Sequence, residues 1–134
     1  MKRVKTRTAR ISVDENGIVI IRIIEGVKMD FEDAADNFLV VKHLTEGGRC
    51  LKLIDARVNW SLDKKAQSFF SGKDVKERTR ARAIVINSTV KKLLLNFFHS
   101  MNVINAPTKV FTDYNEAYKW LKGFNYDSKS DLGF

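Results

Sequence analysis

The sequence lacks the features that define several large classes of protein. It has a single cysteine among 134 residues, so no internal disulfide can form and a disulfide-stabilised secreted scaffold is excluded. No apolar run approaches the roughly 20 residues that a membrane-spanning helix needs. The basic start, residues 1–7, is not followed by the apolar core of a signal peptide. We therefore expect a cytoplasmic protein without a membrane span.

The sequence also lacks the usual patterns of catalytic and cofactor sites. The pair Gly47-Gly48 precedes a predicted strand, whereas a phosphate-binding loop follows one, and no Gly-Lys-Ser/Thr occurs. One cysteine and two distant histidines give no metal-ligand spacing, and Cys50 has the setting of a small buried hydrophobe. No candidate base stands beside a nucleophile. We therefore predict a protein that uses no metal or cofactor and is not an enzyme.

The chain does contain enough apolar material for one ordinary domain. With 134 residues, of which 44% are hydrophobic, it can form one core. We predict a single domain over residues 1–134, with its core in residues 8–122. A basic amino-terminal arm over residues 1–7 and a carboxy-terminal tail over residues 123–134 would flank that core.

Positive charge is concentrated in two segments. The formal net charge is +8, and residues 1–10 and 73–92 each carry a net +5, so the remainder is slightly acidic. Such segments can attract nucleic acid, a lipid headgroup or an acidic protein, or they can simply form a solvated face. Aromatic residues are not interleaved with the basic ones, which disfavours nucleic acid. The basic surface expected in the second segment consists of Arg78, Arg80, Arg82, Lys91 and Lys92.

Hydrophobic periodicity predicts a mixed α/β fold. Strands are expected over residues 8–13, 18–24, 51–55, 82–87 and 108–112, and the first two flank Asn16-Gly17 as a hairpin. Helices are expected from Asp30 to Leu44, from an N-cap at Ser61 to Phe70, from residues 88–89 to Met101, and from Asp113 to Leu121. The inward face of the first helix is expected to carry Phe31, Ala34, Ala35, Phe38, Val41 and Leu44. The order β-β-α-β-α-β-α-β-α predicts a mixed, mostly parallel sheet of about five strands with about four helices.

Few polar residues stand out as candidates for a site. Asp55 ends a central strand, which is where α/β folds place ligands, and Arg57 follows two residues later. These two residues could bind a polar ligand, or they could interact only locally, in an ion pair or a turn hydrogen bond. His99, near the end of the third predicted helix, could exchange a proton or interact with the helix dipole, and His43 has the same alternatives at the end of the first.

Two segments resemble the STAS / SpoIIAA-like superfamily. They are Leu53-Ile-Asp-Ala-Arg57 and Thr108-Lys-Val-Phe-Thr-Asp-Tyr-Asn-Glu-Ala-Tyr-Lys-Trp-Leu121. This superfamily holds the anti-sigma-factor antagonists and is structurally similar to the CRAL-TRIO lipid-binding fold. The chain further resembles the small bacterial STAS/SEC14-like branch, which has an Asn-Phe-Phe segment, here Asn96-Phe97-Phe98. The resemblance covers residues 8–122, implies a SpoIIAA-like fold and adds Asn96 to the candidate ligand or partner residues.

The resemblance implies the fold without the phosphorylation switch of the signalling members. Those members carry Asp-Ser-Ser-Gly-Leu, with one phosphorylated serine, at the start of the helix after the Asp-ended strand. The matching stretch here is Asp63-Lys64-Lys65-Ala66-Gln67, so lysines replace both serines. Ser61 and Ser68 flank the stretch and do not occupy the matching position.

Three functional hypotheses follow. The first is a non-enzymatic STAS-like interaction or regulatory module that binds an unidentified protein and forms a homodimer. The second is a binder of a small ligand or lipid headgroup, which needs an apolar cavity between helices and sheet. The third is binding to nucleic acid or another anionic surface through the basic segments. Candidate interface residues for the first hypothesis are apolar positions outside the predicted core: Leu95, Trp120, Phe124, Tyr126 and Phe134.

Overall fold

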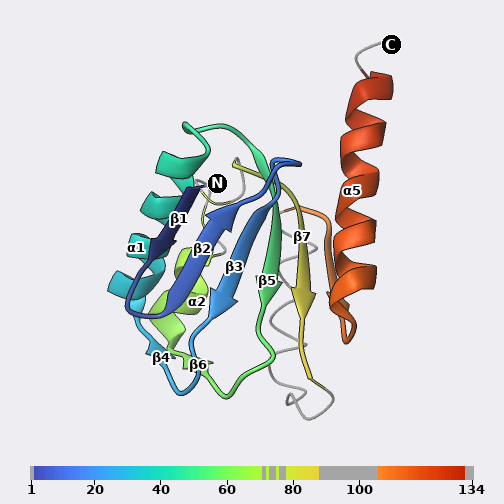
Figure 1. The fold of residues 1–134 in the computed structure, drawn as a ribbon. Coiled ribbons are helices and arrows are strands. Elements are labelled where there is room, and N and C mark those ends of the chain that lie inside the picture. The colour runs from blue at the N-terminus through green and yellow to red at the C-terminus, as the bar shows by residue number, and fades with distance from the viewer. Residues whose placement is uncertain (1, 71, 73–74, 76–77, 88–105, 132–134) are drawn as a thin grey trace.

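A six-stranded mixed sheet forms the centre of the fold (Figure 1). The computed structural model describes residues 2–70, 72, 75, 78–87 and 106–131. In spatial order the strands are β1 (Lys2–Lys5), β2 (Ala9–Val13), β3 (Val19–Ile23), β5 (Cys50–Asp55), β7 (Thr79–Val85) and β8 (Thr108–Phe111). The first two neighbouring pairs are antiparallel and the remaining pairs are parallel. A small parallel sheet pairs β4 (Lys28–Met29) with β6 (Ser61–Leu62).

The helices cover the two faces of the large sheet unequally (Figure 1). Helices α1 (Phe31–Leu44) and α2 (Lys64–Phe70) pack on one face, where Ala34 and Ala66 join a core cluster with Ile84 of β7. Helix α5 (Tyr114–Asp131) packs on the other face, where its Leu121 lies against the apolar residues of β5 and β7. Its neighbours in the sheet are β5, β7 and β8, so on this face it lies over one half of the sheet.

The structure confirms the mixed α/β class and changes several details. Residues 2–5, expected in a basic arm, form edge strand β1, so the sheet has six strands and not about five. The expected helix over residues 88–101 lies outside the described residues, which form three helices. The last helix continues to Asp131 through much of the expected tail. Ser61 is not the N-cap of α2, because Ser61 belongs to β6 and the Asp63 carboxylate accepts the Ala66 amide proton at 2.8 Å.

Helix α1 begins at a capping box that also anchors the amino-terminal strands. The Asp30 side chain accepts from the Asp33 amide at 2.8 Å, and the Asp33 carboxylate accepts from the Asp30 amide at 3.0 Å. Arg7 forms a two-point ion pair with Asp33, with 2.8 Å between Nε and Oδ1. One turn later, buried Asn37 accepts from Thr6 Oγ1 at 2.6 Å and donates to Thr8 Oγ1 at 2.9 Å. This polar seam fixes α1 against the loop between β1 and β2.

The polar seam rotates α1 away from the orientation that its apolar periodicity predicts. Asp33 and Asn37 are buried, whereas Phe31, expected on the core face, is 47% exposed. Phe31 and Phe38 instead pack edge-on against Phe69 at the end of α2, with ring centroids 5.5 and 5.6 Å apart. The expected core positions Ala34, Val41 and Leu44 are buried.

The pairing of Asp33 with Arg7 predicts acid-sensitive stability. The hydrogen bonds from Arg7 lower the pKa of Asp33 from 3.8 to about 2. The unfolded chain therefore binds this proton more readily, so the stabilisation is complete above about pH 4 and is lost as the pH falls toward 2. Asp33→Asn should lower the free energy of unfolding by about 1–2 kcal/mol near pH 7 and by much less near pH 2, as measured by urea unfolding.

Asp36→Asn is the matched control, because Asp36 is exposed on the same helix. It should leave stability within about 0.5 kcal/mol of the wild type over the same pH range. A constant difference between the wild type and Asp33→Asn from pH 7 to pH 2 would contradict the role given to the ion pair.

Candidate functional site

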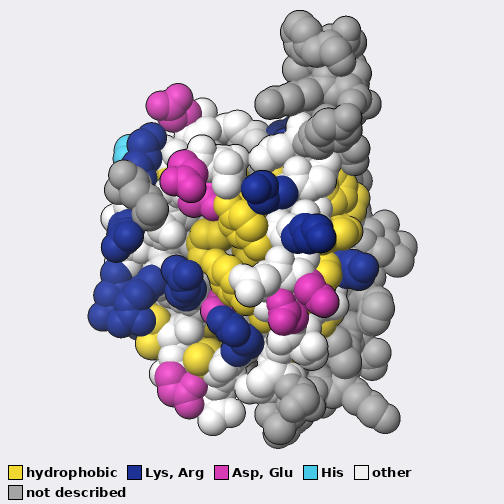
Figure 2. Space-filling model, turned by 45° about the vertical axis from the view of Figure 1, so that its right-hand side comes forward, with side chains coloured by type: hydrophobic (Ala, Val, Ile, Leu, Met, Phe, Trp, Pro, Cys, Tyr) yellow, Lys and Arg dark blue, Asp and Glu magenta, His cyan; other side chains and the backbone are white. Residues whose placement is uncertain are grey.

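The half of the sheet face that α5 leaves open carries a groove of about 600 Å³. We call it the basic groove. Its floor includes Ile20 of β3, and Tyr114 and Tyr118 of α5 stand along one side. Figure 2 shows hydrophobic side chains at the centre of this view with Lys and Arg side chains around them. The lining consists of Arg3, Val4, Lys5, Arg10, Ile11, Ser12, Asp14, Ile20, Arg22, Tyr114 and Tyr118.

Strand register places like charges side by side in the basic groove. Lys5 of β1 is directly opposite Arg10 of β2, and Arg10 is directly opposite Arg22 of β3. Directly opposite residues share a face of the sheet and have Cβ atoms about 4.5–5.5 Å apart. The next residue in this row is Asp55 of β5, opposite Arg22. Three exposed cations therefore occupy adjacent positions, an arrangement that costs stability.

Tyr114 interacts with two guanidinium groups at the edge of the groove. The Arg22 Nη2 donates to the Tyr114 hydroxyl at 3.4 Å. The guanidinium carbons of Arg22 and Arg57 lie 5.9 and 5.4 Å from the centre of the Tyr114 ring. Cations over an aromatic face are attracted by the ring quadrupole. This tyrosine thus connects the cation row to Arg57, at the carboxyl end of β5.

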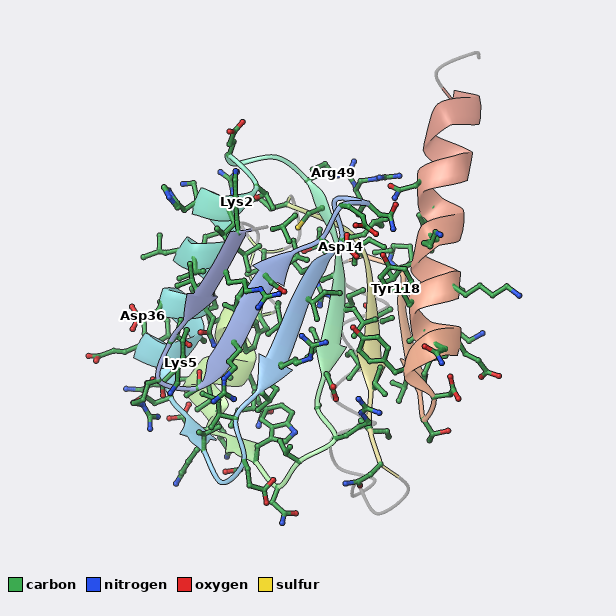
Figure 3. All side chains as sticks on the ribbon, viewed as in Figure 1. Lys2, Lys5, Asp14, Asp36, Arg49 and Tyr118 are labelled. Carbon is green, nitrogen blue, oxygen red and sulfur yellow. The ribbon has the colours of Figure 1, made fainter. Side chains whose placement is uncertain are left out.

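Tyr118 joins α5 to the hairpin turn between β2 and β3 (Figure 3). Its hydroxyl donates to the Asp14 carboxylate and accepts from the Asn16 side-chain amide at 2.7 Å. The other Asp14 oxygen accepts two amide protons of the turn, from Asn16 and Ile18, each at 2.9 Å. Burial and the hydrogen bond to Asp14 raise the pKa of Tyr118 above its usual value of 10.0. The turn, expected from Asn16-Gly17, is therefore fixed to the last helix.

Asp55 and Arg57 form the local ion pair that was one of the two expected alternatives. Arg57 Nε and Nη2 lie 2.9 and 2.8 Å from the two Asp55 oxygens. Burial opposes ionisation of Asp55, but the hydrogen bonds from Arg57 outweigh it and lower its pKa. The two side chains are paired with each other, so they form a fixed edge of the groove.

The prediction of an exposed basic surface in residues 78–92 is wrong for Arg82, and Arg78 and Arg80 are only partly exposed. Arg82 is 1% exposed, because β7 lies between β5 and β8 and is covered on both faces. Arg78 donates to the Gly47 carbonyl, and Arg80 donates to the Phe124 carbonyl at 2.8 Å. Both are half-buried. These arginines are thus tied to the chain's own backbone.

Several expected site residues fall outside the described part of the chain: Lys91, Lys92, Leu95, Asn96, His99 and Phe134. Tyr126 lies in α5 at a position whose side chain is not described. Trp120 and Phe124, expected at an interface, are partly buried and pack on each other with ring centroids 4.9 Å apart. Trp120 also contacts Phe111 of β8, at 5.8 Å between centroids. Both residues therefore belong to the packing between α5 and the sheet.

Sequence reasoning missed Arg22 and the two tyrosines as site residues. Arg22 interrupts the β-branched run of β3, and in a strand that interruption marks an uncovered position. Among the described residues, no three or more His, Cys, Asp and Glu side chains gather as a metal site would require. In the same part of the chain, no helix has the length and apolarity that crossing a membrane requires. Cys50 is buried as expected, and burial raises its pKa.

Comparison with known proteins places the chain in a family. A family model described as a domain of unknown function (DUF7793) matches residues 11–125. The chain belongs to the DUF7793 family. No curated protein matches it.

A solved structure shows the fold of this DUF7793 chain. An uncharacterised protein of the DUF3478 family with a SpoIIAA-like fold, from Shewanella loihica PV-4, aligns with 84% of this chain and 91% of its own. The TM-score is 0.64 at 17% sequence identity. The SpoIIAA-like fold implied by the sequence resemblance is therefore confirmed, while the STAS/SEC14-like branch stays a prediction.

The contact of Tyr118 with the turn predicts two effects of Tyr118→Phe in this DUF7793 protein. Losing the hydroxyl should lower the free energy of unfolding by about 1 kcal/mol, because Asp14 and Asn16 lose a partner. In an ultraviolet titration of tyrosine ionisation, the variant should lack a step that the wild type shows above pH 10.0. A variant that loses only a step at or below that pH would show that Tyr118 is not held by Asp14.

Proposed function

We propose that this DUF7793 protein is a non-enzymatic, STAS-like binding module that docks an acidic segment of a partner protein in the basic groove. The observation that carries the proposal is the row of Lys5, Arg10 and Arg22 on the open sheet face. Each pair of like charges directly opposite one another costs roughly 0.2–1 kcal/mol. Carboxylates of a partner would turn this repulsion into attraction, and arginine forks bind carboxylates at two points.

The groove has further features of a protein interface. Ile20 lies on the groove floor among the cations, and the tyrosines provide rings with polar tips. Tyrosine and arginine are the residue types enriched at the energetic centres of interfaces. Asp14 and Asp55 lie along the groove margin and limit the positive surface to a short row, which is too short for the long phosphate backbone of a nucleic acid. An acidic segment with apolar side chains fits this surface better.

The non-enzymatic part of the proposal rests on the chemistry of the lining. The described residues that line the groove include neither histidine nor cysteine, and their carboxylate, Asp14, is engaged by Tyr118 and the turn amides. The absence of a base beside a nucleophile in this lining favours binding over catalysis. Lys64 and Lys65 are exposed at the start of α2, where the superfamily resemblance places the switch serine.

Binding should be tested with three probes of defined charge. They are a short peptide of Glu and Leu, the same peptide with Gln in place of Glu, and a mixed-sequence DNA duplex. Calorimetric titration at low salt should show binding of the Glu peptide alone. The Arg10→Gln/Arg22→Gln double variant should weaken it by about 1 kcal/mol per arginine, about fivefold each. Tighter binding of the duplex, or equal binding of both peptides, would contradict the proposal.

Lys42→Gln is the matched control for the charge change, because Lys42 is exposed in the last turn of α1, on the opposite face. It should leave the affinity for the Glu peptide unchanged. Lys64→Gln tests the rival location at the start of α2. If Lys64→Gln weakens binding while the double arginine variant does not, the partner binds on α2 and the groove assignment is wrong.

Repulsion within the row of cations also predicts that Arg10, a proposed binding residue, destabilises the free protein. Arg10→Gln removes the central cation of the row, so it should raise the free energy of unfolding by about 0.2–1 kcal/mol while weakening peptide binding. Lys42→Gln should change stability slightly in the opposite direction, because its charge favours the carboxyl end of α1. Urea unfolding at low salt measures both. A destabilised Arg10→Gln would show that the row does not carry repulsion.

Self-association stays a prediction that the same samples test. Trp120 and Phe124 pack on the chain's own sheet, and the remaining expected interface residues lie outside the described side chains. Light scattering should show a homodimer for the full chain, and deletion of residues 123–134 should shift it toward monomer. A full chain that stays monomeric at all concentrations would contradict the homodimer without affecting the groove.

A further inference from the structure

Two cations are buried side by side between the sheet and α1. Lys52 of β5 and Arg82 of β7 are directly opposite one another in the strand register. They are 7% and 1% exposed. Burial lowers the pKa of Lys52 to about 8 and that of Arg82 to about 10, and Arg82 contributes to the shift of Lys52. The basic groove lies on the opposite face, so these cations are no part of it.

Neither cation is neutralised by a carboxylate of the described chain. The Lys52 ammonium donates to Thr79 Oγ1 at 2.9 Å, and that hydroxyl donates to the Val75 carbonyl at 2.7 Å. The two terminal nitrogens of Arg82, Nη1 and Nη2, have no hydrogen-bond partner among the residues that the structure describes. The nearby ionisable group that acts on both pKa values is Cys50, whose own pKa is raised by burial.

Both cations line a cavity of about 50 Å³. The rest of its lining is apolar except for Asn37, whose amide is already bonded to Thr6 and Thr8. The apolar wall comes from α1, the sheet, the end of α2 and the segment after it: Ile21, Phe38, Val41, Ile54, Phe70 and Val75. On a comparable measure one water needs about 10–15 Å³, so the cavity has room for a carboxylate group and a short apolar body.

Unpaired burial of two adjacent cations is costly, and an apolar pair at the same positions would avoid that cost. The effective penalty in proteins is several kcal/mol per buried ion unless a counter-charge and hydrogen bonds offset it. A carboxylate supplies one negative charge and two acceptor oxygens, which match the two unpartnered Arg82 nitrogens and the Lys52 ammonium. A phosphate carries more charge and more oxygens than these donors can pair, and its remaining oxygens would be buried against apolar side chains.

We propose that Lys52 and Arg82 form an internal site for a small monocarboxylate with a short apolar body. The carboxylate lies between the Arg82 guanidinium and the Lys52 ammonium, and the apolar body contacts Phe38 and Val41 of α1. The ligand stabilises the folded protein, because it binds the native state and not the unfolded chain.

The test compares propionate with propionamide, a neutral molecule of nearly the same shape, and with inorganic phosphate. The melting temperature of the wild type should rise with propionate and stay unchanged with propionamide and phosphate at equal ionic strength. The affinity for propionate should fall severalfold between about pH 7 and about pH 9, as Lys52 loses its proton while Arg82, whose pKa is about 10, stays mostly protonated. A melting temperature that rises equally with propionamide, rises only with phosphate, or does not respond at all overturns the proposal.

Two variants and one measurement on the wild type locate the site. Arg82→Met and Lys52→Met each replace the cation with an unbranched, uncharged side chain, so both should lose the propionate response. The matched control is Lys42→Met, because Lys42 is an exposed cation of α1 that lines neither the cavity nor the basic groove, so this variant should keep the full response. If the core variants do not fold, nitrogen-15 spectra of the arginine side chains in the wild type decide. Propionate should shift a guanidinium signal protected from solvent, and spectra in which only exposed arginines respond would show that binding is elsewhere.

Discussion

The width of a single helix determines which half of the sheet stays uncovered on the α5 face. A helix with its side chains is about 10–12 Å wide and strands are about 4.8 Å apart, so one helix covers two or three strands. On the face where α5 packs, it contacts β5, β7 and β8. The half-sheet of β1, β2 and β3 on that face therefore has no helical cover among the described residues. Most side chains of β1, β2 and β3 that point to this face are polar, and most of the polar ones are cations.

Much of the fold could be predicted because its determinants are local. The hairpin follows from alternation around Asn16-Gly17, and the helix starts at Asp30 and Asp113 follow from capping residues. Strand β1 could not be predicted in the same way. Lys2–Lys5 is short, carries three cations and has no apolar alternation, which is also what protects an edge strand from pairing with other chains. Its position becomes defined only by the register with β2.

The candidate sites were harder to predict because burial depends on covering elements that lie far away in sequence. Leu51-Lys52-Leu53 alternates as a half-exposed strand would, yet α1 covers the face to which Lys52 points. Arg82 was assigned to a basic surface for the same reason. In α1 the polar residues Asp33 and Asn37 face inward, because Arg7, Thr6 and Thr8 from the loop after β1 supply their partners.

The two proposed sites lie on opposite faces of neighbouring strands and are both positive. Arg22 is opposite Asp55 in the register, and Lys52 is three residues before Asp55, so alternation directs Arg22 and Lys52 to different faces. A partner in the groove and a carboxylate in the cavity therefore do not compete for space. They do interact through charge, since the buried cations add to the positive potential above the groove and an internal carboxylate reduces it. Linkage makes this effect reciprocal, so any coupling between the two ligands must be negative, and it must weaken with salt at the exposed groove.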